Sequence, residues 1–513
     1  MKTYSTDETV DAVVIGLGAG GAPLLARLAA AGLSVVALEA GPWHDPERDF
    51  ATDEVAQNDL YWLDERLSAG ENAIGFGANN SGKGVGGSTL HFTAYVPRAQ
   101  KDDFLLKTES GVGEDWPIPF EEMIPYYEEV ERTIGVSGPD PYPWGGPRGK
   151  GYPLPPLPLN GAALLMQKAC AERGILTTPA PNAALSRPYD VEGVGPRGAC
   201  TNRGFCQAGC NNRAKGSMDV TFVPLAVGAG AEIRPHSFVT EIELREGSVD
   251  AVVYVDGEGK SHRQRCRHLF LCAGAIETPR LLLLNGLANA SGEVGKNFMI
   301  HVGVQVWGQF DAEIHPWKGI PGGLISEDTH RVKDGGFAGG YLLQSIGVMP
   351  VTYAQQFARA TGRFGRDMAD HMAGYNRVAG INVLGEGLPY AHNFLELSDE
   401  KDGRGLPKPR VHFTAGENEK RMETHAERLM RELWDSQGAK DVWSFIRYAH
   451  TIGTCRMGND PARSVVDADG RSHEIPNLTI SDNSTFPTSL AANPALTIMA
   501  LSLRTADRFL SRG

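Results

Sequence analysis

Residues 11–21 read Asp11-Ala12-Val13-Val14-Ile15-Gly16-Leu17-Gly18-Ala19-Gly20-Gly21, and they open a unit that ends at Glu39. The apolar run from Ala12 to Ile15 is long enough for a buried strand and too short for a helix. After the glycines come apolar residues at helical spacing and a second apolar run, namely Leu24, Leu25, Leu28, Ala29 and residues 33–38. This order predicts a strand, a glycine turn, a helix and a second strand.

The glycine turn has the spacing that lets the backbone approach a pyrophosphate. Gly16 permits the tight turn, Gly18 allows the close approach, and Gly21 allows the helix to pack on the strand. The helix N-terminus then offers unpaired N–H groups to the phosphates. Glu39 lies 21 residues after Gly18, close to the spacing at which an acidic side chain accepts a hydrogen bond from a ribose hydroxyl. We therefore expect this unit to bind a dinucleotide.

Length and charge limit the other possibilities. A chain of 513 residues favours two domains built from discontinuous segments. The formal charge of -13 argues against nucleic acid or an anionic membrane as a partner. No stretch approaches the ~20 apolar residues of a spanning helix, and residues 1–8 contain no apolar signal region. We therefore expect a cytoplasmic protein without a membrane span.

A second glycine-rich segment covers residues 82–93 and includes Gly86-Gly87-Ser88, His91 and Thr93. The segment could be a second close approach of the backbone to the cofactor. It could equally be a glycine-rich turn with a solvated histidine, and the spacing does not separate the two interpretations.

Cys200, Cys206 and Cys210 lie within eleven residues of one another. Such a group could hold an iron–sulfur cluster or form one disulfide, but its spacing matches none of the common cluster patterns. We expect packed, reduced thiols and no bound metal.

The rest of the chain gives coarser predictions. A helix is expected near residues 120–134, and alternating apolar residues over 232–271 predict a hairpin or a three-stranded antiparallel unit. Pro279 should lie in the first turn of a helix over residues 280–284. Residues 41–72 are expected to form an irregular loop or lid. Residues 302–434 carry no nucleotide signature and are the expected substrate-recognition region.

The C-terminal part again shows a clear pattern. A glycine-punctuated segment begins at His450, and residues 478–482 predict a strand that ends at Asp482. Asn493-Pro494 then begins a helix whose apolar stripe includes Leu496, Met499 and Leu503. We expect the N-terminus of this helix, with Asn493 beside it, to lie near the end of that strand.

The glycine turn, residues 82–93, residues 274–286 and the tail together resemble the glucose–methanol–choline (GMC) family of FAD-dependent oxidoreductases. The resemblance covers nearly the whole chain except roughly residues 310–400. It implies an α/β fold with a Rossmann-like FAD-binding domain and a discontinuous α+β substrate-binding domain built on an antiparallel sheet. The expected FAD-binding segments are 1–110, 190–300 and 440–513, and the expected substrate-binding segments are 111–189 and 301–439.

The resemblance also implies which residues contact FAD and which act on the substrate. His450 and Asn493 fall on the family's two active-site positions, with histidine suited to act as general base at neutral pH. The implied FAD contacts are Gly16, Gly18, Gly21, Glu39, Gly86, Gly87, Ser88, His91, Thr93, Val239, Asp482, Asn493 and Pro494.

Residues 86–93 are similar to the segment of pyranose oxidases in which a histidine bonds covalently to the flavin, so His91 could carry FAD covalently or only contact it. The tail and the cysteine segment look more like FAD-dependent sugar dehydrogenases. Bacterial glycoside 3-oxidases, which resemble pyranose oxidases and oxidise the C3 hydroxyl of sugars and plant glycosides, are the best single placement. The resemblance therefore implies oxidation of a sugar or glycoside hydroxyl, at C3 or C2 of a glucosyl unit, with oxygen or a quinone as electron acceptor.

Three other interpretations remain open at this point. The chain could be the large catalytic subunit of a membrane-linked sugar, gluconate or sorbitol dehydrogenase. It could be a flavin-binding scaffold without turnover. Since the glycine turn does not separate NAD from FAD, it could also be a nicotinamide-dependent dehydrogenase. The sequence leaves the oligomeric state unassigned.

Overall fold

The computed structural model describes residues 2–75, 81–146 and 148–512. A seven-stranded sheet contains the first glycine turn and has the order β7-β2-β1-β10-β9-β8, with β20 paired to β10. Its strands are β1 (Thr9–Ile15), β2 (Val35–Leu38), β7 (Glu232–Arg234), β8 (Phe238–Arg245), β9 (Ser248–Val255), β10 (Ser261–Leu271) and β20 (Leu478–Ile480). The strands β7, β2, β1, β10 and β20 run parallel, whereas β8, β9 and β10 form an antiparallel meander.

The centre of this sheet follows from the apolar run that opens the chain. β1 lies between β2 and β10, so that Val14 pairs with Ala37 on one side and Phe270 on the other. These residues are fully buried, as expected for parallel strands covered on both faces. Helix α1 (Ala22–Ala30) packs on β2, α6 (Phe222–Gly228) and α11 (Ala495–Leu510) pack on α1, and α4 (Phe120–Ile134) packs on α11. The predicted helix near 120–134 is therefore confirmed.

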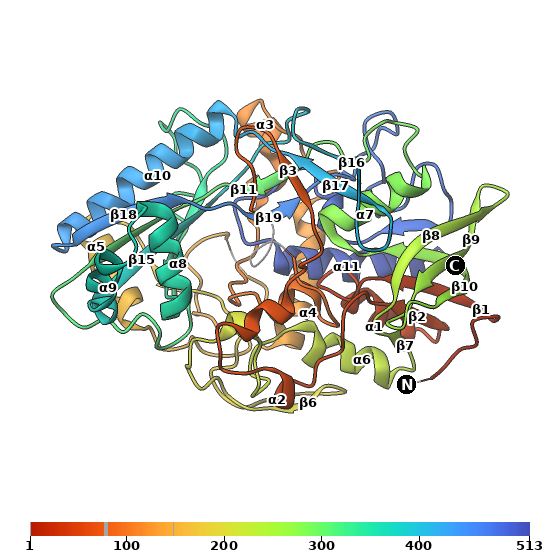
Figure 1. Cartoon of the computed structure of the whole chain (residues 1–513), viewed down its shortest axis with the longest axis horizontal. Helices are drawn as coiled ribbons and strands as arrows, with labels where there is room; N and C mark the ends of the chain where they lie inside the picture. Colours follow the sequence, from red (N-terminus) through yellow and green to blue (C-terminus); the bar gives the residue numbers. More distant parts are fainter. Residues whose placement is uncertain (1, 76–80, 147, 513) are drawn as a thin grey trace.

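A second, fully antiparallel sheet has the order β18-β12-β15-β14-β13-β4. Its strands are β4 (Thr178–Pro179), β12 (Val304–Gln309), β13 (Leu324–Ser326), β14 (Tyr341–Ile346), β15 (Val378–Gly385) and β18 (Lys440–Ile446). Helices α5 (Gly161–Glu172) and α10 (Glu417–Ser436) pack against it. Both chain ends lie on the side of the parallel sheet, and α10 lies at the opposite end of the molecule (Figure 1).

Smaller elements connect the two sheets. The remaining strands are β3 (Leu67–Ala69), β5 (Tyr189–Val191), β6 (Gly195–Arg197), β11 (Met299–His301), β16 (Phe394–Lys401), β17 (Pro407–His412) and β19 (Ala449–Ile452). The remaining α-helices are α2 (Pro46–Asp49), α3 (Leu106–Ser110), α7 (Gly274–Asn285), α8 (Pro350–Thr361) and α9 (Arg366–Met372). The expected loop over 41–72 is thus interrupted by α2 and by β3, which pairs with β17.

The prediction of a helix that starts near Arg280 is wrong. α7 begins at Gly274, and Pro279 lies inside it. Proline lacks an N–H group, so the helix bond to the carbonyl of Ala275 cannot form. The hydroxyl of Thr454 donates to that carbonyl at 2.8 Å instead. A side chain from a distant segment therefore allows the helix to contain the proline.

The division into two domains stays a prediction, and we propose two changes to its boundaries. β18 (Lys440–Ile446) pairs with β12 of the antiparallel sheet, although the expected FAD-binding segment starts at residue 440. α4 packs against α11, although residues 120–134 were expected in the substrate-binding domain. Among the residues that the structure describes, no helix combines the length and the apolar character that a membrane crossing needs.

Candidate active site

A cavity lies between the two sheets, lined by the carboxyl ends of β1 and β2 and by residues of β14 and β15. The two glycine turns meet on its wall. Gly16, Gly18, Gly87 and Ser88 all line it, and a Cβ added to Gly87 would lie 2.6 Å from the Cα of Gly18. This contact leaves no room for a side chain at Gly87, so the turns form a backbone surface.

Gly21 and Gly86 were expected to contact the cofactor, but neither lines the cavity. A Cβ at Gly21 would lie 2.0 Å from the carbonyl oxygen of Gly16, so this glycine allows α1 to pack closely. Gly86 has a φ of +115° and donates its N–H to the carbonyl of Leu17 at 3.0 Å. These two glycines support the conformation and packing of the two turns without lining the cavity.

Glu39 joins the segments that form this end of the cavity. Its carboxylate accepts hydrogen bonds from the N–H groups of Leu17 at 3.0 Å, Gly41 at 2.9 Å and Gly84 at 3.2 Å. Burial raises the pKa of Glu39, and the three N–H donors oppose that rise. A carboxylate can accept about four hydrogen bonds, so one acceptor position is left for a ribose hydroxyl.

Val239, Asp482 and Thr93 also line the cavity. The Asp482 carboxylate accepts from the N–H of Gly274 at 2.8 Å, the hydroxyl of Thr278 at 2.6 Å and the N–H of Ser484 at 2.8 Å. The tail strand β20 and the start of α7 are thereby held together at the cavity wall.

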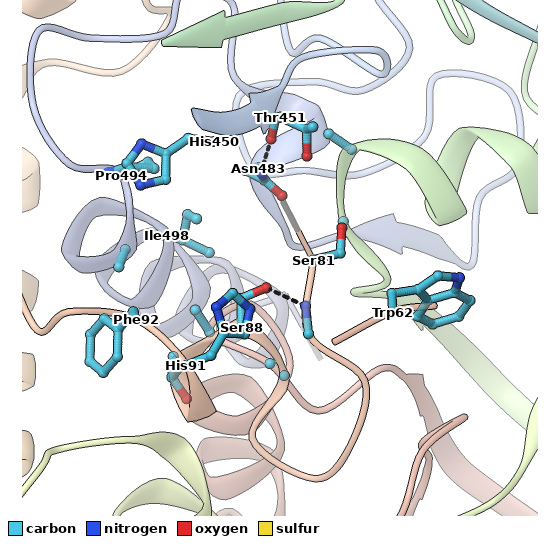
Figure 2. A pocket seen from close by; sticks show the side chains of 18 of the residues that line it. Trp62, Ser81, Ser88, His91, Phe92, His450, Thr451, Asn483, Pro494 and Ile498 are labelled. Atoms are coloured by element: carbon cyan, nitrogen blue, oxygen red, sulfur yellow. Dashed lines mark hydrogen bonds between the residues drawn. The ribbon is translucent and has the colours of Figure 1, made fainter. Parts of the chain in front are cut away.

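His91 lines the cavity and has an unpaired ring nitrogen. Its ring is buried against Tyr61, with 4.9 Å between ring centroids, and its Nε2 has no hydrogen-bond partner among the described residues. Burial and the nearby Lys215 lower the pKa of His91 to about 3, so the ring is neutral. Figure 2 shows His91, Phe92 and Ser88 on one side of the cavity and His450 with Pro494 on another.

Lys215 holds the segment that carries His91. Its buried ammonium donates to the carbonyl oxygens of Leu90 at 2.7 Å, Phe92 at 3.3 Å and Cys206 at 2.5 Å. The cysteine segment is therefore tied to the His91 segment, and its Gln207 lines the cavity. Cys200, Cys206 and Cys210 are free thiols, and the absence of a metal stays a prediction.

His450 has a histidine partner that the sequence did not reveal. β11 and β19 pair with a bulge next to His301, and His450 has a φ of +60°, a conformation that non-glycine residues rarely adopt. This local geometry brings the Nδ1 atoms of the two rings to 2.9 Å. The Nε2 of His301 lies 2.8 Å from the carbonyl oxygen of Leu490.

The two hydrogen bonds determine which nitrogen of His450 carries the proton. A carbonyl oxygen only accepts, so the proton of His301 must lie on Nε2 and its Nδ1 must accept. The Nδ1–H of His450 then donates to that acceptor. The Nε2 of neutral His450 is consequently left with a free lone pair, as a general base requires.

Burial keeps both rings neutral. His450 is half-buried, and it lines the cavity. Protein atoms enclose its ring on the other sides. Burial, followed by His301, Arg447 and His91, holds its pKa well below the usual value. Burial also lowers the pKa of His301 to about 4. At neutral pH the site therefore offers an unprotonated imidazole.

Asn493 and Pro494 line the same cavity at the N-terminal end of α11. The Oδ1 of Asn493 accepts a hydrogen bond of 2.6 Å from Gln344 on β14. Sequence reasoning did not find His301 or Gln344, because neither belongs to a recognisable motif.

These residues fit a flavin dinucleotide. The glycine turns provide a backbone surface for phosphates, Glu39 provides an acceptor, and His91, whose Nε2 is unpaired, lines the cavity. All three lie on the cavity wall that also bears His450 and Asn493.

Comparisons with known proteins agree with this arrangement. Two models of the family described as GMC oxidoreductase match residues 78–303 and 389–502. The chain is 30% identical to 2-methyl-1,2-propanediol dehydrogenase of Mycolicibacterium austroafricanum over 99% of this chain and 96% of that protein. It is 30% identical to the fructose dehydrogenase large subunit of Gluconobacter japonicus over 98% of each.

Formate oxidase of Aspergillus oryzae has the same fold, with a TM-score of 0.73, 16% identity and 99% of each chain covered. The chain therefore belongs to the GMC oxidoreductase family, whose members are FAD-dependent enzymes that oxidise CH–OH groups.

Proposed function

We propose that this enzyme oxidises a secondary hydroxyl of a sugar or glycoside, at C3 or C2 of a glucosyl unit, to a keto-sugar. The observation that carries the proposal is the neutral His450, whose free Nε2 and neighbour Asn493 face one cavity. Amide and hydroxyl side chains also line this cavity, together with the charged Arg447, and they support a polyhydroxylated substrate.

The chemistry divides between the protein and its cofactor. His450 accepts the proton of the substrate hydroxyl through Nε2, and Asn493 holds the hydroxyl oxygen. The positive end of the α11 dipole favours negative charge at this place. Bound FAD supplies the acceptor for the hydride that leaves the alcohol carbon. Loss of one proton and one hydride converts the secondary alcohol to a ketone.

The substrate end of the cavity is lined by amides and hydroxyls, among them Gln207, Gln344, Gln356, Asn382 and Thr352. Such groups match the alternating donors and acceptors of a sugar ring. The acids that line the cavity in the described part of the chain are Glu39, Glu277 and Asp482, and each already has partners. We therefore expect neutral sugars to be preferred to positively charged amino sugars.

In the proposed complex, the residues Gly16, Gly18, Gly87 and Ser88 lie against the FAD pyrophosphate. Glu39 would accept from the adenosine ribose, and Val239 and Thr93, which line the same cavity, would hold the adenine and flavin parts respectively. A covalent bond from His91 to the flavin is part of this proposal, since His91 lines the cavity and its Nε2 has no hydrogen-bond partner among the described residues. Acid precipitation tests the bond, because flavin that stays with the pellet is covalently held.

Anaerobic reduction of the enzyme-bound flavin by a panel of alcohols tests the function. The panel contains neutral monosaccharides, β-glucosides, an amino sugar and 2-methyl-1,2-propanediol, and NMR identifies the oxidised carbon. Neutral sugars should bleach the flavin, with a ketone at C3 or C2. Bleaching by the diol alone would refute the proposed substrate class.

The His450→Ala variant belongs to the same test. It should slow flavin reduction by roughly 10²- to 10⁴-fold, the usual effect of removing a general base, and should retain its FAD. Near-normal reduction would show that another residue is the base.

The electron acceptor is proposed to be oxygen or a quinone, and a cytoplasmic location stays a prediction. The likeness to a fructose dehydrogenase large subunit favours a second candidate, in which the chain is the catalytic subunit of a dehydrogenase complex. Reoxidation of the purified lone chain by oxygen would exclude dependence on such a complex.

A further inference from the structure

We propose that a row of four amide side chains determines which end of Asn493 faces the substrate. The amide row consists of Gln305, Asn382, Gln344 and Asn493, and Trp307 lies at its far end. This inference rests on the proposed function, because it assigns positioning residues for the same reaction.

The row crosses three neighbouring strands of the antiparallel sheet. Gln305 on β12 is directly opposite Asn382 on β15, and Asn382 is directly opposite Gln344 on β14. Directly opposed residues lie on one face of a sheet. Trp307 is two residues after Gln305 on β12, so it lies on that face as well.

Hydrogen bonds connect the side chains in sequence. The distances are 3.2 Å from Trp307 Nε1 to Gln305, 3.0 Å from Gln305 to Asn382, 3.5 Å from Asn382 to Gln344 and 2.6 Å from Gln344 to Asn493. The three interior amides and Trp307 are all buried, so each depends on its neighbours for partners.

The indole of Trp307 fixes the donor-to-acceptor direction of the hydrogen bonds along the row. An indole N–H only donates, so Gln305 must turn its oxygen toward Trp307 and its amino group toward Asn382. The same reasoning applies at Asn382 and again at Gln344. The amino group of Gln344 therefore faces Asn493, whose Oδ1 accepts. The Nδ2 of Asn493 is then the end available to the cavity, which Asn493 lines.

The hydrogen-bond donor that Asn493 presents complements the acceptor that His450 presents. A hydroxyl between the two residues would accept a hydrogen bond from Asn493 Nδ2 and donate its proton to His450 Nε2. If the row ran in the opposite direction, Asn493 would present an oxygen. Two acceptors would then compete for one hydroxyl proton, and the negative charge that develops on the oxygen would lack a donor. The row thus acts as a remote positioning device for the substrate oxygen.

Gln305→Glu is the informative variant, because Gln305 does not line the cavity. An ionised carboxylate would accept hydrogen bonds from both neighbours. The amides of Asn382, Gln344 and Asn493 would then each have to flip, so that oxygen and nitrogen exchange places. A protonated carboxyl would still donate to Asn382 and keep the original direction. Burial raises the pKa of such a carboxyl, so the direction should change with pH.

The control is Gln305→Met, which interrupts the row without reversing it. At pH 8 the Gln305→Glu variant should reduce flavin roughly 10²-fold more slowly than wild type, the scale for losing one donor to a developing oxyanion. It should also be slower than Gln305→Met, and it should recover as the pH falls, which Gln305→Met should not do. Equal rates and parallel pH profiles for the two variants would overturn the proposal.

Neutron crystallography of the deuterium-exchanged wild-type holoenzyme supplies a readout that does not depend on activity or on the folding of a variant. Deuterons on the Asn493 nitrogen that faces the cavity support the proposal, and deuterons between Asn493 and Gln344 that belong to Asn493 overturn it. If no sugar reduces the flavin, the proposed function fails, but the deuteron positions still decide the direction of the row.

Discussion

The position of one proton decides whether His450 can act as a base. His301 fixes that position, since it accepts from His450 at Nδ1 while donating to Leu490. In His301→Leu the Nδ1–H of His450 would lose its acceptor, and the ring could move its proton to Nε2. We expect flavin reduction to slow by roughly 10-fold or more.

His301→Gln is the matched control, because its amide can accept from His450 and donate to the Leu490 carbonyl. It should keep most of the rate. Nitrogen NMR of labelled histidine should show the Nδ1–H form of His450 in wild type and in His301→Gln, but not in His301→Leu. Equal rates in both variants would contradict the role assigned to His301.

The glycine turns give a second prediction for a single residue. A Cβ at Gly18 would lie 3.6 Å from the Cα of Gly87, which is an ordinary contact, so Gly18→Ala should fold. The added methyl group would nevertheless extend into the proposed phosphate path. We expect FAD affinity to fall about tenfold or more, measured from absorbance and fluorescence titration of the apoprotein. Gly228→Ala in α6, where a Cβ meets open space, is the control and should bind FAD normally.

Residues with a motif could be predicted from the sequence, and residues without one could not. The structure places Gly16, Gly18, His450 and Asn493 around one cavity. His301 and Gln344 were missed because their importance arises from strand register. A bulge in β11 turns His301 toward His450, and no sequence period contains that information.

At the scale of elements, α7 contains a proline because of a side chain from another segment. Thr454 donates to the Ala275 carbonyl, whose helix donor Pro279 cannot supply. Thr454→Val has the same shape but no hydroxyl, so it should leave this carbonyl unsatisfied. We expect a loss of roughly 1–3 kcal/mol in the free energy of unfolding, measured by denaturant titration of the holoenzyme.

The double variant Thr454→Val/Pro279→Ala tests whether the missing N–H of Pro279 makes the Thr454 hydroxyl necessary. Pro279→Ala restores an N–H group that can bond Ala275 within the helix, so Thr454→Val should cost clearly less in that background. Additive effects of the two substitutions would refute the explanation. The helix start was mispredicted for the same reason, since proline usually marks a first turn and its interior use here depends on a contact 179 residues away.

Across the whole molecule, buried neutral histidines make stability depend on pH. Burial lowers the pKa of His301 to about 4, whereas an unfolded histidine titrates near 6.5. Between these values the unfolded chain binds more protons, so this contribution is complete above pH 6.5 and is lost as the pH falls toward 4. Buried acids such as Glu386, whose pKa is raised to about 7, act in the opposite direction over part of this range.

A comparison of variants isolates the histidine. His301→Gln should lower the slope of unfolding free energy against pH by up to about 1.4 kcal/mol per pH unit between pH 6.5 and 4.5. Denaturant titrations of both proteins at several pH values measure it. Identical slopes would show that His301 is charged in the folded state.

The larger architecture was predictable in unequal parts. The β1–α1–β2 unit of the parallel sheet follows from apolar runs and a glycine turn that are close in sequence. The antiparallel sheet is built from strands between residues 178 and 446. Buried polar residues such as Gln305 and Asn382 lie on one of its faces, so its strands do not show the sequence pattern of an apolar buried face. Long-range pairing determines that part of the fold, and local patterns do not specify long-range pairing.

The central strand β1 has one neighbour, β2, that follows it closely in the chain and another, β10, that comes more than two hundred residues later. The cavity wall is completed later still, by Asp482 after β20 and by the N-terminal end of α11. A nascent chain on the ribosome therefore carries an unfinished nucleotide site until the residues that follow β20 and the start of α11 have been synthesised. FAD binding must wait until these residues have been added, so the supply of FAD acts on a chain that already contains α11.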